Sequence, residues 1–216
     1  MMKICRLSHS INAHTPVYGG VDKPIFEQVQ SISKGDSCNE TYVKMKAHTS
    51  THVDYPLHFV KNGKNANDWG GFFQYKNAAV VDSYIDNNLF FVKTLPKINN
   101  LECLIVNIPI PYERVDPEYY LNSPGMSIEL TNQILKKYTS LKAIMMNSLS
   151  ISSKKNREIG RKVHKLFLNK NILIFEDLNL KNLNLDIHKS CILISSLFDE
   201  KIDGSPVEIL AIEYEK

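Results

Sequence analysis

The segment His48-Thr49-Ser50-Thr51-His52-Val53-Asp54-Tyr55-Pro56-Leu57-His58 contains three of the seven histidines of this chain. Its β-branched residues and Pro56 disfavour a helix, so we expect an extended backbone. At ~3.3 Å per residue, His48 and His52 would then lie ~13 Å apart, and a turn or bulge must shorten this span before they can share an ion. Side chains alternate along an extended chain, and a bend can turn the even-numbered ones toward one pocket: His48, His52, Asp54 and His58.

Imidazole and carboxylate groups in this pattern predict a metal site. Zinc and manganese both accept such ligands, so the sequence leaves the identity of the metal open. Further ligands are expected from elsewhere in the chain. Glu176 directly follows the apolar run 172–175, and α/β sheets place their sites at the carboxyl ends of buried strands. His164 lies at the edge of the apolar face of an expected helix, from which it can face the same crevice.

Apolar runs and helical periodicities predict an α/β fold with a mixed central sheet. We expect one helix to begin near Ser127, whose hydroxyl can cap it, and a second, amphipathic helix over about 154–169. The N-terminal third has strand patterns but few helical ones, so the sheet should not be wholly parallel. Without repeats or linkers, residues 1–216 should form a single domain. A half-buried strand is expected at 41–47, and further strands at 78–81, 103–110, 143–146, 172–175, 191–197 and 207–214.

The composition describes a globular protein and excludes disordered and fibrous classes. The chain has 216 residues, 43% of them hydrophobic, and 26 basic against 23 acidic residues give a formal charge of +3. So balanced a charge argues against a dedicated nucleic-acid or membrane-surface protein. The basic residues between 154 and 165 are interpreted as a solvated helix face, because no aromatic residues are interleaved with them for base stacking. The expected partner is a small molecule or another copy of the chain.

The sequence shows no signal for export or membrane insertion. The N-terminus lacks an apolar h-region, and no run approaches the ~20 apolar residues of a membrane span. Four scattered cysteines without a C-x-x-C pair are typical of a reducing compartment, so we expect a cytoplasmic protein whose thiols hold no metal. These are Cys5, Cys38, Cys103 and Cys191.

Aromatic residues follow the histidine-rich segment. Trp69 and Phe72, with Phe73, lie in a glycine-containing stretch, where their rings could sandwich a planar substrate. The alternative is that Phe72 and Phe73 belong to the core or to an interface between subunits.

The histidine-rich segment resembles the motif H-x-G-T-H-x-D-x-P-x-H of the cyclase family of metal-dependent hydrolases, which includes bacterial kynurenine formamidases and isatin hydrolases. It matches at every specified position except Ser50, which replaces the glycine. Two other departures are Asn147, where many members carry Asp, and Tyr18-Gly19, where formamidases often have Trp-Pro. Further segments are similar to the family: 7–11, 15–20, 123–127, 147–151 and 204–207.

The resemblance implies a swivelling β/α/β fold, a homodimer or higher oligomer, and one or two divalent ions, zinc or manganese. By carry-over, His48, His52 and Asp54 would hold the first ion. Asp54 would bridge to a second ion that is also held by His164 and Glu176. His58 would then serve as the acid/base in hydrolysis of a small amide.

The reaction implied first is that of an arylformamidase, which converts N-formylkynurenine to kynurenine and formate in tryptophan catabolism. Hydrolysis, cyclisation or dehydration of another cyclic amide, lactone or hydroxy acid would use the same site. A non-catalytic metal- or ligand-binding module is the alternative from a different functional class.

Overall fold

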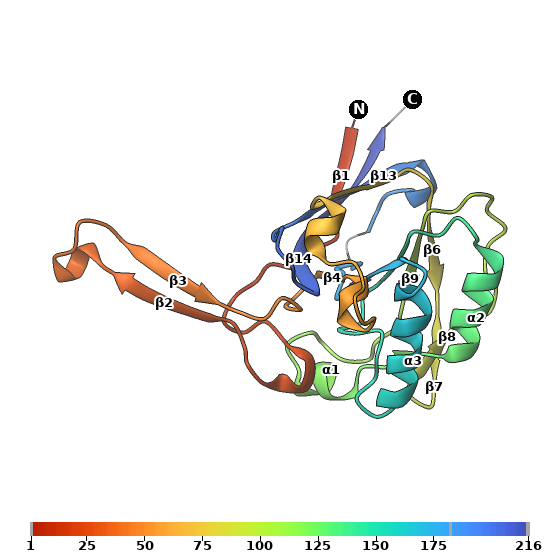
Figure 1. The fold of residues 1–216 in the computed structure, drawn as a ribbon, viewed down its shortest axis with the longest axis horizontal. Helices are drawn as coiled ribbons and strands as arrows, with labels where there is room; N and C mark the ends of the chain where they lie inside the picture. The colour runs from red at the N-terminus through yellow and green to blue at the C-terminus, as the bar shows by residue number, and fades with distance from the viewer. Residues whose placement is uncertain (1, 182, 215–216) are drawn as a thin grey trace.

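A computed structural model describes residues 2–181 and 183–214 of the chain. In this part of the chain, the strands of the core form a nine-stranded mixed sheet, as expected for the α/β class (Figure 1). Across the sheet they are β5 (Phe72–Tyr75), β13 (Ser190–Ser196), β14 (Gly204–Tyr214), β4 (His52–Asp54), β12 (Leu173–Glu176), β11 (Ala143–Met146), β9 (Cys103–Asn107) and β6 (Ala78–Asp82), with β1 (Met2–Arg6) also pairing with β14.

The sheet has a parallel half and an antiparallel half. Strands β6, β9, β11 and β12 are paired in parallel, whereas β4, β14, β13 and β5 each pair antiparallel with their neighbours. The two halves meet where β12 pairs antiparallel with β4. Because α/β sheets bind ligands beyond the carboxyl ends of their parallel strands, Glu176 at the end of β12 marks this junction as a candidate site.

Buried strands send alternate side chains into two apolar clusters, one on each face of the sheet. On β11, Ile144 belongs to one cluster and Met145 to the other. Helices α2 (Ile128–Lys137) and α3 (Arg157–Leu168) cover the first face. On the second face, side chains of β5, β13 and β14 pack with those of β9 and β11, so the antiparallel half curls over the parallel half.

The expected core elements are confirmed, with shifts of a few residues at their ends. The Oγ of Ser127 accepts a hydrogen bond from the backbone N–H of Leu130 at 3.1 Å and so caps α2. Helix α3 is shorter than the expected range 154–169, because its first helical residue is Arg157. No helix in the described ranges combines the length and the apolar character that a membrane crossing requires.

A two-stranded hairpin of β2 (Ile25–Gln30) and β3 (Glu40–Lys44) projects from the body of the molecule (Figure 1). The strand expected at 41–47 therefore exists, but the expectation that it is half-buried is wrong. Every residue of β3 is exposed, because β3 pairs only with β2. The hairpin and the turn after β2 expose apolar side chains: Ile25, Phe26, Val29, Ile32, Tyr42 and Val43.

Smaller elements complete the described fold. Strands β7 (Tyr84–Asp86), β8 (Leu89–Phe91) and β10 (Gly125–Met126) form a three-stranded sheet, and α1 (Pro117–Asn122) precedes β10. Short 3-10 helices lie at Tyr18–Gly20, Ile32–Lys34, Pro56–His58, Ala66–Trp69 and Ile187–Lys189.

Candidate metal centre

Strand pairing brings three of the predicted ligands together at the junction of the two sheet halves. His52 and Asp54 lie on the same face of the three-residue strand β4, and both are buried. Glu176, the last residue of β12, pairs directly with His52. Two short strands therefore place two carboxylates and an imidazole in one buried spot.

A turn at Ser50 brings His48 to the same place. Ser50 has φ 61°, in the left-handed region, and the chain bends there before β4. The ring centroids of His48 and His52 consequently lie 5.1 Å apart, far closer than a fully extended chain would allow. The 3-10 helix after β4 carries His58, whose ring centroid is 4.1 Å from that of His48. The turn expected from the sequence is thus present, and all three motif histidines converge.

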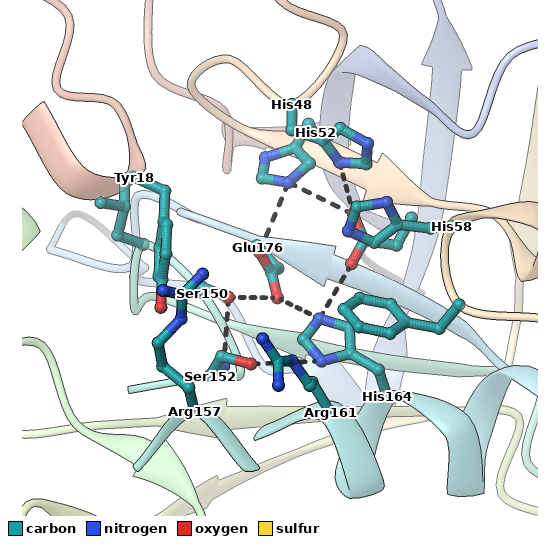
Figure 2. A pocket seen from close by; sticks show the side chains of 13 residues that line it. Tyr18, His48, His52, His58, Ser150, Ser152, Arg157, Arg161, His164 and Glu176 are labelled. Atoms are coloured by element: carbon teal, nitrogen blue, oxygen red, sulfur yellow. Dashed lines mark hydrogen bonds and ion pairs between the residues drawn. The ribbon is translucent and has the colours of Figure 1, made fainter. Parts of the chain in front are cut away.

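Helix α3 supplies the fourth histidine of the cluster. His164 is buried, and its Nε2 lies 3.3 Å from Asp54 Oδ2 and 3.6 Å from Glu176 Oε1. The five predicted ligands and His58 therefore meet at one site, although they come from separate segments of the chain (Figure 2).

Backbone carbonyl groups fix the orientation of two imidazoles. The Nδ1–H of His52 donates to the carbonyl of Ser50 at 2.8 Å, and the Nδ1–H of His164 donates to the carbonyl of Gly160 at 2.8 Å. A ring that donates from Nδ1 to a carbonyl keeps Nε2 available as a ligand atom. In His52 that Nε2 lies 3.4 Å from a carboxylate oxygen of Asp54 and 3.4 Å from one of Glu176.

The donor set fits a divalent metal ion. Asp54 Oδ2 is buried and accepts no hydrogen bond from the described residues, an arrangement that is costly unless a cation compensates it. Ligand atoms of His48, His52 and Asp54 lie within 4.8 Å of one another, and so do those of Asp54, His58 and His164. Imidazole nitrogens and carboxylate oxygens are ligands of zinc and manganese.

The electrostatics of the cluster favour cations. Burial opposes the charged form of each histidine, but hydrogen bonds to Asp203 and Asp54 raise the pKa of His48 to about 9. The nearby carboxylates of Asp54 and Glu176 likewise outweigh burial and raise the pKa of His164 to about 9. Although burial acts to raise the pKa of the Asp54 carboxyl, its histidine partners hold that pKa well below the ordinary value. The carboxylates therefore stay negative and attract either protons or a metal ion.

Asp203 completes the cluster, and the sequence argument did not single it out. One of its oxygens, Oδ2, accepts hydrogen bonds from His48 Nε2 at 2.9 Å and from His58 Nδ1 at 2.7 Å. The next residue, Gly204, lies against the imidazole of His48 so closely that a Cβ there would overlap the ring. The sequence signal that could have identified Asp203 is its position, because it immediately precedes the segment 204–207 that resembles the family.

The cluster opens into a cavity of about 220 Å³. Tyr18, Phe59, Arg157 and Arg161 are among the residues that line it, together with the metal-ligand candidates (Figure 2). The interpretation of the basic residues at 154–165 as a solvated face agrees with the exposure of Arg157 and Arg161, but it did not foresee that they also line the cavity. Both are exposed, but α3 directs them along the cavity wall rather than away from it.

The family model with the description “Putative cyclase” matches residues 5–153, about two thirds of the chain. The chain belongs to this cyclase family. No curated protein matches the sequence significantly.

Solved structures share the cyclase-family fold at low sequence identity. Isatin hydrolase A from Ralstonia solanacearum is 17% identical, with a TM-score of 0.72 over 99% of this chain and 92% of its own. Isatin hydrolase A from Labrenzia aggregata, bound to benzyl benzoate, is 16% identical, with a TM-score of 0.74 over 99% and 94%. A potential metal-dependent hydrolase with cyclase activity is 18% identical, with a TM-score of 0.67 over the full length of both chains.

The predicted substrate contacts of this cyclase-family chain lie outside the cavity. Trp69 and Phe72 do not line the cavity: Trp69 packs against Phe73 with ring centroids 6.2 Å apart, and Phe72 is 61% exposed on β5. Phe73 is buried in the core, as the alternative interpretation held. Two other aromatic residues, Tyr18 and Phe59, line the cavity. Phe59 stacks on His164 with ring centroids 4.2 Å apart and directly follows the last motif histidine.

Proposed function

We propose that this cyclase-family protein is a metal-dependent hydrolase of small amides, and that aryl formamides such as N-formylkynurenine are its first candidate substrates. The observation that carries the proposal is the buried cluster of imidazoles and carboxylates, which opens directly into a small cavity. The names of the structural relatives support hydrolase chemistry, because they include isatin hydrolases and a potential metal-dependent hydrolase.

Six side chains have roles in this proposal. His48, His52 and Asp54 would hold one ion, and Asp54 would bridge to a second ion held by His164 and Glu176. A bound zinc or manganese ion lowers the pKa of water toward neutrality and polarises a carbonyl group. The backbone N–H of Ile151 donates to Glu176 Oε1 at 2.6 Å and holds that carboxylate in place. The sixth side chain, His58, is proposed to carry the proton.

His58 is suited to moving a proton between water and the leaving nitrogen. Its Nδ1–H donates to Asp203, which orients the ring and leaves Nε2 for proton exchange. Asp203 also accepts a hydrogen bond from His48, so it couples the proposed acid/base to a proposed ligand. The ligand atom of His58 also lies within 4.8 Å of those of Asp54 and His164, so metal binding is the alternative role of His58.

The decisive experiment is hydrolysis of N-formylkynurenine by protein loaded with zinc or, separately, with manganese. A chelated sample is the blank, and the metal bound per chain is measured in parallel. We expect metal-dependent formate release with kcat/KM of ~10⁴ M⁻¹s⁻¹ or above. Bound metal without turnover would redirect the search to cyclic amides, lactones and hydroxy acids, whereas protein that binds no metal would refute the proposal.

The same proposal includes self-association and a cytoplasmic location. The exposed apolar side chains of the β2–β3 hairpin support a homodimer or higher homo-oligomer, because water-exposed apolar clusters of this kind mark contact surfaces. Cys38, Cys103 and Cys191 carry free thiols, which supports a reducing compartment.

A further inference from the structure

Two arginines on the cavity wall have no role in the chemistry proposed above. Arg157 and Arg161 lie one turn apart on α3, and His164 follows on the same side of the helix. In the close view of the cavity, both guanidinium groups lie at the α3 side, and His48 and His58 lie at the other (Figure 2). The cavity therefore has a cationic wall that is separate from the motif histidines.

Nothing in the described part of the chain neutralises this wall. Neither Arg157 nor Arg161 makes an ion pair or a hydrogen bond with a described residue. The acidic residues that line the cavity, Asp54 and Glu176, are engaged with histidines. Repulsion between two like charges one helical turn apart destabilises a helix slightly. An anion bound between the two guanidinium groups would replace this repulsion with attraction.

Tyr18 faces the same wall and adds a neutral donor. It lines the cavity close enough to feel the charges of both arginines. Burial raises the pKa of the phenol, an effect that the arginines oppose only in part, so the hydroxyl keeps its proton at neutral pH. Two guanidinium groups and one O–H are therefore available to an anionic oxygen, while the Glu176 carboxylate on the same cavity is held by histidines.

We propose that Arg157 and Arg161 bind a carboxylate of the substrate that is separate from the carbonyl group undergoing hydrolysis. The inference rests on the proposed function, because that function places the reacting carbonyl at the imidazole–carboxylate cluster. With a rise of ~1.5 Å per residue, the backbone positions of Arg161 and Arg157 lie ~4.5 Å and ~10.5 Å along the helix axis from that of His164. The two arginines thus start from about one and two helical turns along α3 from His164, toward the N-terminus of the helix.

This separation defines a substrate class. The preferred substrates are amides that carry a carboxylate several bonds away from the scissile carbonyl, as N-formylkynurenine does. A neutral cyclic amide or lactone offers the arginines no charge before its ring opens. Guanidinium groups bind carboxylates through paired, charge-assisted hydrogen bonds, so the contact supplies orientation as well as affinity.

The first test compares N-formylkynurenine with its methyl ester, which lacks the carboxylate charge and carries an added methyl group. The readout is the ratio of the kcat/KM values for formate release from the acid and the ester. We expect the wild-type protein to favour the acid at least tenfold, and R157Q/R161Q to lose most of this preference. The matched control is K162Q/K165Q, which removes two charges from the same helix outside the cavity and should retain the preference. Equal rates for acid and ester in the wild-type protein would overturn the proposal.

The second test needs no turnover and so separates this proposal from the proposed function. Phenylacetate and its neutral analogue phenylacetamide are titrated into chelator-treated protein, and binding is followed by ligand-observed NMR. We expect R157Q/R161Q to bind phenylacetate at least tenfold more weakly than the wild-type protein and K162Q/K165Q do, with no matching change for phenylacetamide. Unchanged phenylacetate affinity in R157Q/R161Q overturns the arginine site, even if the protein hydrolyses amides. Tenfold weaker binding supports the site, even if N-formylkynurenine is not hydrolysed.

Discussion

The β4–β12 junction and the β2–β3 hairpin both reverse the usual distribution of polar and apolar side chains. At the junction, His52, Asp54 and Glu176 are buried, although ionisable groups normally lie in water. On the hairpin, Phe26 and Val43 are directly paired across the two strands and exposed, although such side chains normally lie in a core. Each region is unfavourable in isolation, but for opposite reasons.

The difference indicates what each region lacks. Buried carboxylates surrounded by imidazoles favour a bound cation, because a nearby positive charge helps to offset the cost of their desolvation. Exposed apolar side chains are compensated by another apolar surface, because burial removes them from water. The junction therefore predicts a metal partner, and the hairpin predicts a protein partner.

Removing the charge of Asp54 is expected to have the largest effect, because it should abolish most zinc binding at the junction. In D54N the buried cluster loses the carboxylate shared by both proposed ions, so zinc affinity should fall more than a hundredfold. The measurement is metal bound per chain, together with the rise in the thermal midpoint on adding zinc, which binding to the folded state produces. D86N, which changes an exposed carboxylate on β7, is the control. If D54N binds zinc as the wild-type protein does, the junction is not a metal site.

Changing His58 distinguishes a proton carrier from a ligand at the same junction. H58A should retain stoichiometric zinc but lose about 10²–10⁴-fold in kcat, the usual contribution of acid/base catalysis. Metal content and turnover are measured on the same sample. Loss of metal equal to that in D54N would instead assign His58 to the metal shell with Asp54 and His164.

The hairpin is tested by making its exposed face polar. F26S/V43T removes two cross-strand apolar side chains. Burial of each side chain in a dimer interface would stabilise the dimer by ~1.5–3 kcal/mol. The variant should therefore dissociate at protein concentrations where the wild-type protein is associated. Light scattering after size-exclusion chromatography gives the mass of each species. A wild-type protein that is monomeric at every concentration would contradict the proposed dimer.

Gly204 tests how tightly the junction is packed. In G204A the new Cβ must displace the His48 ring, which disturbs its contacts with Asp54 and Asp203. We expect zinc affinity to fall about 10–100-fold, as it does when partners that orient metal ligands are altered. The double variant H48A/G204A should bind zinc almost as well as H48A alone, because the His48 ring that the new Cβ would displace is already absent. A large further loss in the double variant would show that Gly204 acts by another route.

Ser50 is expected to give the smallest effect. Its left-handed backbone favours the glycine of the family motif, but its hydroxyl accepts a hydrogen bond from Arg114 Nη2 at 3.0 Å. S50G loses this hydrogen bond but removes the backbone strain. Because the two effects oppose each other, its free energy of unfolding should stay within about 1 kcal/mol of the wild-type value. S50A keeps the strain and loses the bond, and should be the less stable of the two in chemical denaturation. The opposite order would mean that the hydroxyl contributes nothing.

The sequence predicted that the ligand candidates meet at the junction, because most of them are recognisable from short stretches of sequence. The three motif histidines and Asp54 lie in one short segment, and Glu176 directly follows an apolar run that reads as a buried strand. The core strands were predictable for the same reason, since continuous apolar runs reflect burial on both faces. His164 was placed correctly through its position beside the apolar face of α3.

The remaining features depend on contacts between distant segments. Asp203 reaches His58 across 145 residues, and no local pattern identifies such a partner. Periodicity placed Arg157 and Arg161 on the polar side of α3, but it cannot reveal that this side borders a cavity. In the same way, the alternation of polar and apolar residues in β3 indicates a strand, but it does not show whether the strand packs against the core.

Strand β14 gives the junction a dependence on the order of synthesis. Its first three residues pair with β4, its last five pair with β1, and Asp203 immediately precedes it. The ribosome synthesises the five proposed metal ligands and His58 before it synthesises this strand. During that interval the nascent chain leaves one edge of β4 unpaired and His48 without Asp203. If the junction binds metal as proposed, we expect a complete site only after residues 203–214 have emerged, and an edge of β4 that chaperones can reach until then.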